Sequence, residues 1–319
     1  MPVNHRNTEG ITQVSQQSLI QLRHRAVNLP LDNRKIHARQ GGAYLSSFKG
    51  RGMEFDESRA YLPGDDIRSM DWKVTARTGQ PHTKVFQEEH ERPVLIWLDL
   101  NPSMFFATRG AFKSVVASHA ATLLAWSVAA SNDRLGALVF AGDDHVELRP
   151  KRGKSAVLDF IKHTCQHPAW QNNLNHKKPR NMGLAMSRLR KVTRPGSLLF
   201  LISDFREMDD QAKSHLINLS RNNDIVLIHV SDPIESSLPE AGQYKVSDGL
   251  NELALNTANV KLREEYQQRF IRHQNNLVKL CRQHRIYLLP ISTDKDTLDS
   301  LQNGLGIRSG KNTQFRASR

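Results

Sequence analysis

The sequence predicts an α/β protein built on a doubly wound, mostly parallel sheet with one antiparallel edge strand, preceded by a small β-rich module. The first observation behind this fold class is a set of continuously apolar, strand-length runs that begin after residue 90. Runs of this kind are typical of parallel strands that helices cover on both faces. The runs occupy residues 94–100, 134–140, 197–203, 224–230 and 285–291.

The second observation is that helical patterns lie between these runs. Apolar residues recur at three- and four-residue steps over 112–126 and again around Leu216 and Leu219. A longer amphipathic pattern covers 262–281. Strands that alternate with helices form βαβ units, and this alternation favours a parallel sheet.

Two segments interrupt the alternation and predict hairpins. The residues after Phe140, Ala-Gly-Asp-Asp, have the chemistry of a turn. The alternating residues that follow predict an antiparallel edge strand over 144–148. A second hairpin is predicted around 242–253, before the last long helix.

Glycine, proline and charge divide the chain into four predicted parts. Residues 1–40 are expected to be a tail with a short helix near Leu19 to Ala26. Residues 41–91 are dense in glycine, proline and charged side chains, and they are expected to form the β-rich module. The α/β domain is predicted over 92–300, and the basic residues 301–319 are expected to be a flexible tail.

Composition argues against several classes of protein. The two cysteines, Cys165 and Cys281, lie far apart in sequence and predict neither a disulfide framework nor a C-x-x-C metal site. No stretch is apolar over the roughly 20 residues that cross a bilayer, and the N-terminus lacks the apolar core of a signal peptide. We therefore expect a cytoplasmic protein without a membrane segment. The motifs G-x-x-x-x-G-K-[ST], G-x-S-x-G and H-E-x-x-H are also missing from the sequence.

The net charge of +13 makes nucleic-acid binding an alternative function. The positive charge is spread along the chain, and part of it lies in the expected C-terminal tail. No aromatic–basic interleaving and no zinc-finger spacing accompanies it. We therefore expect that nucleic acid is not the main partner.

The predicted module contains the unusual stretch GRGMEFDESRAYLPGDDIRSMDW over residues 50–72. Its acids alternate with arginines, so that much of the charge can pair internally, and Asp65 or Asp66 is expected to cap a short helical turn. This pattern favours a charge-paired structural module, with a partner-binding surface as the alternative that stays open. The residues expected at such a surface are Arg51, Glu54, Arg59, Asp65, Asp66, Arg68, Asp71 and Trp72.

Three carboxylates follow predicted parallel strands, namely Asp99, Asp204 and Asp232. Ligands of open parallel sheets bind beyond the carboxyl ends of the strands, so these side chains are expected at one rim of the sheet. Acids gathered in this way could hold a divalent cation with an open water position. A Mg²⁺-dependent hydrolase of an ester or phosphate is therefore a second alternative function.

The segments DLNPSM, which follows the first predicted strand, and LISDF, at the end of the third, resemble a von Willebrand factor A domain. The long stretch from about Ser47 to Met104, with DRLGALVF and DPIESSLP further on, resembles the bacterial family called domain of unknown function 58. Such proteins are commonly associated with MoxR-type AAA+ ATPases and are thought to act as their adaptor or co-chaperone partners. Many members carry transmembrane helices near the N-terminus, and membrane anchoring is not carried over to this sequence.

The resemblance also implies a Mg²⁺ site at the rim. Asp99, Ser103 and Asp204 match the A-domain motif, whose hydroxyls bind the metal and whose acids balance its charge. Asn101 stands in place of the first serine, and Arg180 stands where the motif has a threonine. Three outcomes follow: Mg²⁺ binds; Arg180 replaces it and offers its remaining donors to an incoming carboxylate; or the site has decayed.

Taken together, the residues and the resemblance predict a protein that is not an enzyme. We expect the rim, with Arg180 and Asp232, and the charged module to be presented to a protein partner. The expected partner is a MoxR-type AAA+ ATPase, which would hydrolyse nucleotide while this chain links it to a client protein.

Overall fold

The structure is a computed structural model, and it describes residues 9–29, 31, 53–88, 93–171, 182–239, 242–247 and 252–307. The described residues divide into two units. One unit contains residues 53–88, and the other contains the remaining described residues on both sides of them. Each unit is described by itself.

The larger unit is centred on a six-stranded sheet with the strand order β10-β7-β6-β3-β4-β5. Neighbouring strands are parallel except β4 and β5, which form the predicted antiparallel hairpin at one edge. The predicted fold class is therefore confirmed. The strands are β3 (Pro93–Asp99), β4 (Arg134–Ala141), β5 (Asp144–Arg152), β6 (Leu198–Ser203), β7 (Asp224–Ser231) and β10 (Tyr287–Ser292).

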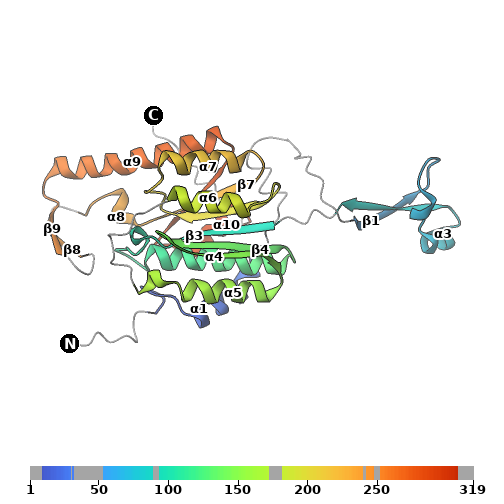
Figure 1. Ribbon diagram of the computed structural model, residues 1–319, viewed down its shortest axis with the longest axis horizontal. Coiled ribbons are helices and arrows are strands. Elements are labelled where there is room, and N and C mark those ends of the chain that lie inside the picture. The colour runs from blue at the N-terminus through green and yellow to red at the C-terminus, as the bar shows by residue number, and fades with distance from the viewer. Residues whose placement is uncertain are drawn as a thin grey trace. The chain divides into compact units, whose positions relative to one another are not determined.

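Helices cover both faces of this sheet because its strands are apolar on both sides (Figure 1). Along β3, Leu95 and Trp97 pack into one cluster, and Ile96 and Leu98 pack into the other. The first cluster includes residues of α6 (Met182–Val192), α7 (Asp210–Ser220) and α9 (Val260–Gln283). The second includes residues of α1 (Gln16–Ala26), α4 (Lys113–Ala130), α5 (Lys154–Cys165) and α10 (Thr297–Leu305).

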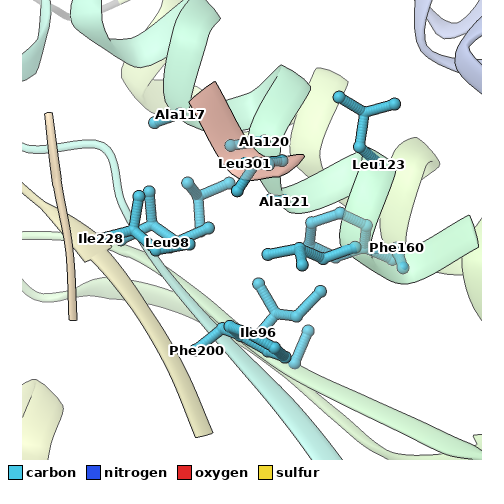
Figure 2. Packing of buried hydrophobic residues seen from close by; sticks show 14 of the residues in the cluster. Ile96, Leu98, Ala117, Ala120, Ala121, Leu123, Phe160, Phe200, Ile228 and Leu301 are labelled. Carbon is cyan, nitrogen blue, oxygen red and sulfur yellow. The ribbon is translucent and has the colours of Figure 1, made fainter. Parts of the chain in front are cut away.

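Helix α4 is the central helix of the second face, and most of its side chains are buried. Small residues such as Ala120 and Ala121 lie among the large apolar side chains of the strands (Figure 2). Its other neighbours in this layer are α1, α5 and α10. Among the described helices, none combines the length and the apolar character that crossing a bilayer requires.

The ends of the larger unit differ from the predicted boundaries. Helix α1 was expected in an N-terminal tail, but it packs on α4 and buries Leu19 and Leu22 in the core. Helix α10 extends past residue 300, where the flexible tail was expected to begin, and buries Leu301 and Leu305. Both helices have apolar residues at helical spacing, and the core covers that stripe.

The smaller unit contains an antiparallel pair, β1 (Met53–Ala60) and β2 (His82–Glu88), and two short helices between them. These are η2 (Ile67–Ser69) and α3 (Trp72–Thr78). Aspartates begin both, since Asp66 accepts a hydrogen bond from the Arg68 N–H and Asp71 accepts from the Lys73 and Val74 N–H groups. The helix α3 ends at Gly79, whose φ of 73° favours glycine.

Short elements complete the larger unit. The second predicted hairpin is present as β8 (Gln243–Ser247) and β9 (Glu252–Asn256), which pair antiparallel. Short helices follow two of the parallel strands, η3 (Pro102–Met104) after β3 and α8 (Pro233–Ser236) after β7. A further turn, η4 (Pro168–Trp170), follows α5.

Candidate functional site at the rim of the sheet

The carboxyl ends of β3, β6 and β7 carry the three predicted aspartates. Asp99 is the last residue of β3, Asp204 follows β6 and Asp232 follows β7. All three are almost completely buried. The parallel register therefore brings these acids to one rim of the sheet, as predicted, but beneath its surface.

Asp99 is held by donors from its own chain end and from the neighbouring strand. Its Oδ1 accepts the Asn101 N–H at 2.8 Å, and its Oδ2 accepts the Ser203 hydroxyl at 2.6 Å. Burial, together with the nearby charge of Asp204, raises the pKa of Asp99 to about 7. Asp99 therefore keeps its proton up to a pH well above the one at which an aspartic acid ordinarily loses it.

Asp204 lies in a sharp turn after β6. Phe205 has a φ of 51°, an uncommon conformation for a residue with a side chain, and its N–H donates to the Ser203 hydroxyl at 2.9 Å. The Lys113 ammonium donates to Asp204 Oδ2 at 2.8 Å. Burial acts to raise the pKa of Asp204, but the charges of Lys113 and Arg206 outweigh it and lower the pKa to about 2.

Lys113 is the main feature of the rim that the sequence did not predict. It is the first residue of α4, its side chain is 0% exposed, and its ammonium lies between Asp204 and Glu235. The distance from Lys113 Nζ to Glu235 Oε1 is 2.6 Å. A signal was present in the sequence, because Lys113 is the only Lys, Arg, Asp or Glu in the helix that otherwise reads as apolar.

Glu235 and Asp232 form a reciprocal cap at the start of α8. Glu235 Oε2 accepts the Asp232 N–H at 3.2 Å, and Asp232 Oδ1 accepts the Ile234 N–H at 3.1 Å. Asp232 Oδ2 also accepts the Thr108 N–H at 2.9 Å and the Thr293 hydroxyl at 2.6 Å. One carboxylate therefore connects the loops that follow β3, β7 and β10.

Arg206 lies at the solvent side of this cluster, with 45% of its side chain exposed. One terminal nitrogen is 3.1 Å from Glu235 Oε1, and Nε is 4.0 Å from Asp204 Oδ2. The neighbouring α9 contributes His273, a ring nitrogen of which is 3.1 Å from the Asp204 carbonyl oxygen. The guanidinium of Arg206 is thus a surface cation held in place by buried acids.

The residues expected to bind Mg²⁺ do not fit that ion as they are arranged. Asn101 Oδ1 accepts the Gly142 N–H at 2.8 Å, and the other polar atom of its side chain is an amide nitrogen, a donor that does not bind a cation. Ser103 Oγ is buried and unpartnered, but Asp204 already pairs with Lys113. Within the described ranges, no group of three or more His, Cys, Asp and Glu side chains is placed to hold a metal. Metal binding by these residues stays a prediction.

Arg180, which was expected to replace the metal, lies outside the described residues. The pairing predicted between Arg180 and the two acids is therefore neither supported nor contradicted. For Asp204, the buried cation that the structure describes is Lys113.

Several of the predicted partner-binding residues make contacts inside the smaller unit, and Trp72 is exposed. Arg59 pairs with Asp65 at 2.7 Å, and Asp71 accepts the Ser58 hydroxyl at 2.8 Å, a bond that lowers the pKa of Asp71. Trp72 is 65% exposed. Arg51 and the side chain of Glu54 lie outside the described parts, and Asp66 and Arg68 share the turn at η2.

The fold and this rim define a doubly wound, mostly parallel α/β protein in which internal donors engage the rim acids. The model of the family described as Protein of unknown function DUF58 matches residues 57–276, and the chain belongs to this family.

Relatives and solved structures that resemble the chain carry few functional descriptions. Uncharacterized proteins of Mycobacterium bovis and Mycobacterium tuberculosis are 28% identical over 264 residues, which cover 81% of this chain and 80% of each relative. An aerotolerance-related membrane protein from Bacteroides fragilis is 15% identical with a TM-score of 0.40, and the match covers 68% of this chain and 100% of that one. The hypothetical protein BatB from Bacteroides thetaiotaomicron is 16% identical with a TM-score of 0.38, covering 68% and 97%. The SpRpn10 VWA domain is 13% identical with a TM-score of 0.37, covering 66% and 94%.

Proposed function

We propose that this chain is a non-enzymatic adaptor that docks on a protein partner at the rim of its sheet. The proposed partner is a MoxR-type AAA+ ATPase, and the chain links that ATPase to a client protein. Membership of the DUF58 family supports the choice of partner through the association that the resemblance implies.

The observation that carries the proposal is that internal donors occupy the rim acids. Asp99 accepts from Ser203, and Asp204 accepts from Lys113. Asp232 accepts from Thr108 and Thr293. A general base needs a lone pair within reach of its substrate, and a catalytic metal needs an open position. Because the three rim carboxylates already accept internal hydrogen bonds, the rim is better suited to recognising a partner than to catalysing a reaction.

The group that suits recognition is the Arg206 guanidinium. Its side chain is half-exposed, and one of its terminal nitrogens lies 3.1 Å from Oε1 of the buried Glu235. A guanidinium binds a carboxylate through parallel, charge-assisted hydrogen bonds. The partner's docking segment is therefore proposed to present an acidic side chain to Arg206.

The test is affinity capture with the tagged full-length chain from an extract of its own cells, with and without ATP. We expect recovery of an AAA+ ATPase of MoxR type, identified by mass spectrometry. Arg206→Ala should reduce that recovery roughly tenfold, which corresponds to losing about 1.4 kcal/mol of binding free energy.

Arg149→Ala is the matched control, because Arg149 is an exposed arginine on the edge strand β5. It should capture the ATPase as well as the original chain does. Equal capture by Arg206→Ala, with folding verified by thermal melting, would contradict docking at this rim. Recovery of nucleic acid without any ATPase would contradict the adaptor function itself.

A further inference from the structure

At the rim, three buried side chains of opposite charge contact one another. Two carboxylates, Asp204 and Glu235, and one ammonium, Lys113, are all at least 98% buried, and the ammonium contacts both acids at 2.8 and 2.6 Å. An isolated buried charge is expensive, so each of these groups depends on the others. A lysine ammonium has three donors and no acceptor, which suits a position between acids.

We propose that the Lys113 ammonium is a built-in cation, which does at this rim what a divalent metal ion would do for a set of rim acids. Lys113 lies at the start of α4, Asp204 follows β6, and Glu235 lies in α8, which follows β7. The ammonium of Lys113 contacts both acids. It therefore ties two loops to the central helix through one positive charge. The rim assembles without a metal ion and has no need of one.

The positions of the remaining polar atoms support this inference. A Mg²⁺ ion binds oxygen at about 2.0–2.1 Å and would repel an ammonium a few ångströms away. To bind Asp204, the ion would have to displace Lys113, whose Nζ is 2.8 Å from Asp204 Oδ2. Asn101 does not compensate, because its amide oxygen accepts the Gly142 N–H and its other polar atom is a nitrogen donor. Ser103 Oγ is then the one unpartnered oxygen among the four residues expected to bind Mg²⁺.

The inference is independent of which partner docks, so its test measures stability and not capture. The original chain should show the same melting temperature in EDTA and in excess MgCl₂ or MnCl₂, and no heat of Mg²⁺ binding by calorimetry. Lys113→Ala removes the cation and opens space beside two buried acids. It should melt at a lower temperature, and excess Mg²⁺ or Mn²⁺ should recover about 5 °C or more of the loss.

A second variant covers the outcome in which Lys113→Ala does not fold. The triple change Lys113→Met, Asp204→Asn, Glu235→Gln keeps the approximate side-chain volumes and removes all three charges. It should fold and should not respond to metal, because no acid then requires a cation. If Lys113→Ala is unfolded and the triple variant folds, the charge explains the loss and the inference holds.

Three results would overturn the inference. The first is a melting temperature of the original chain that rises with Mg²⁺. The second is a folded Lys113→Ala that no divalent ion stabilises. The third is a triple variant that remains unfolded alongside Lys113→Ala, because packing of the lysine stem, and not its charge, would then be what the rim requires.

Discussion

At the scale of single residues, the rim shows how neighbours decide the protonation of similar groups. Asp99 and Asp204 are equally buried, yet the pKa of Asp99 is raised to about 7 and the pKa of Asp204 is lowered to about 2. The difference arises because Lys113 contacts Asp204, whereas Asp99 has only neutral donors. Sequence placed both acids at the rim but could not distinguish them, because the distinguishing residue lies on another element.

His229 provides a prediction about acid stability. It is a buried residue of β7, and burial, together with the positive charges of His273 and nearby basic groups, lowers its pKa to about 3. The unfolded chain, with a histidine pKa near 6.5, therefore binds more protons than the folded chain between about pH 6.5 and 3. The free energy of unfolding should fall on acidification through this window, with a contribution from His229 of up to about 1.4 kcal/mol per pH unit.

The measurement is urea unfolding at a series of pH values for the original chain and for His229→Gln. The variant should show a shallower decline, whatever its offset at neutral pH. His119 and His167, whose pKa values burial also lowers, are unchanged in both proteins and cancel in the comparison. Parallel curves would show that His229 does not titrate in this way.

At the scale of elements, the strands and the short helix α1 were predictable, but the packing of α1 on the core was not. Continuous apolar runs indicated each of the central strands, because burial on both faces leaves no room for polar residues. Helix α1 is different, because only a narrow stripe of it is apolar and nothing local shows which surface covers that stripe. Its docking on α4 depends on residues about a hundred positions later, such as Trp126, whose ring N–H donates to the Leu19 carbonyl oxygen.

The two faces of α1 allow a matched test of that docking. Leu19 is 0% exposed and Ile20, the next residue, is 41% exposed. Leu19→Ala should lower the free energy of unfolding by about 2–5 kcal/mol, because it leaves a cavity in the core. Ile20→Ala should cost well under 1.5 kcal/mol. Chemical denaturation of both variants gives the two values, and equal losses would mean that α1 is not part of the core.

At the scale of the whole molecule, the family and its fold could be recognised from long, distinctive motifs, but the chemistry of the site could not. The resemblance implied metal ligands, and the matching residues Asp99, Ser103 and Asp204 are present. The metal-binding motif did not include Lys113 or Glu235, which determine how those residues are used. A motif specifies only its own positions, whereas the charge balance is set by further side chains that the fold brings beside them.

The smaller unit gives a prediction that concerns the proposed adaptor function. Trp72, at the start of α3, is 65% exposed, and large aromatic side chains are frequent anchors of protein interfaces. Trp72→Ala should change the free energy of unfolding by no more than about 0.5 kcal/mol. It should nevertheless weaken capture of the ATPase in the pull-down described above by more than about fivefold, or about 1 kcal/mol.

Leu158→Ala is the control for this prediction, because Leu158 is an exposed apolar residue of α5 in the other unit. It should leave both stability and capture unchanged. Undiminished capture by Trp72→Ala would restrict the docking surface to the rim of the sheet.

The contacts of Asp232 have a mechanical consequence for any partner that docks. Its single carboxylate receives bonds from Thr108, Thr293 and the backbone of Ile234, which belong to three separate crossings of the sheet. A force applied to one of these loops is passed to the other two through the hydrogen bonds of this one carboxylate. A partner that pulls on one of these loops would therefore act on all three loops together, and the force would reach the strands that precede them directly.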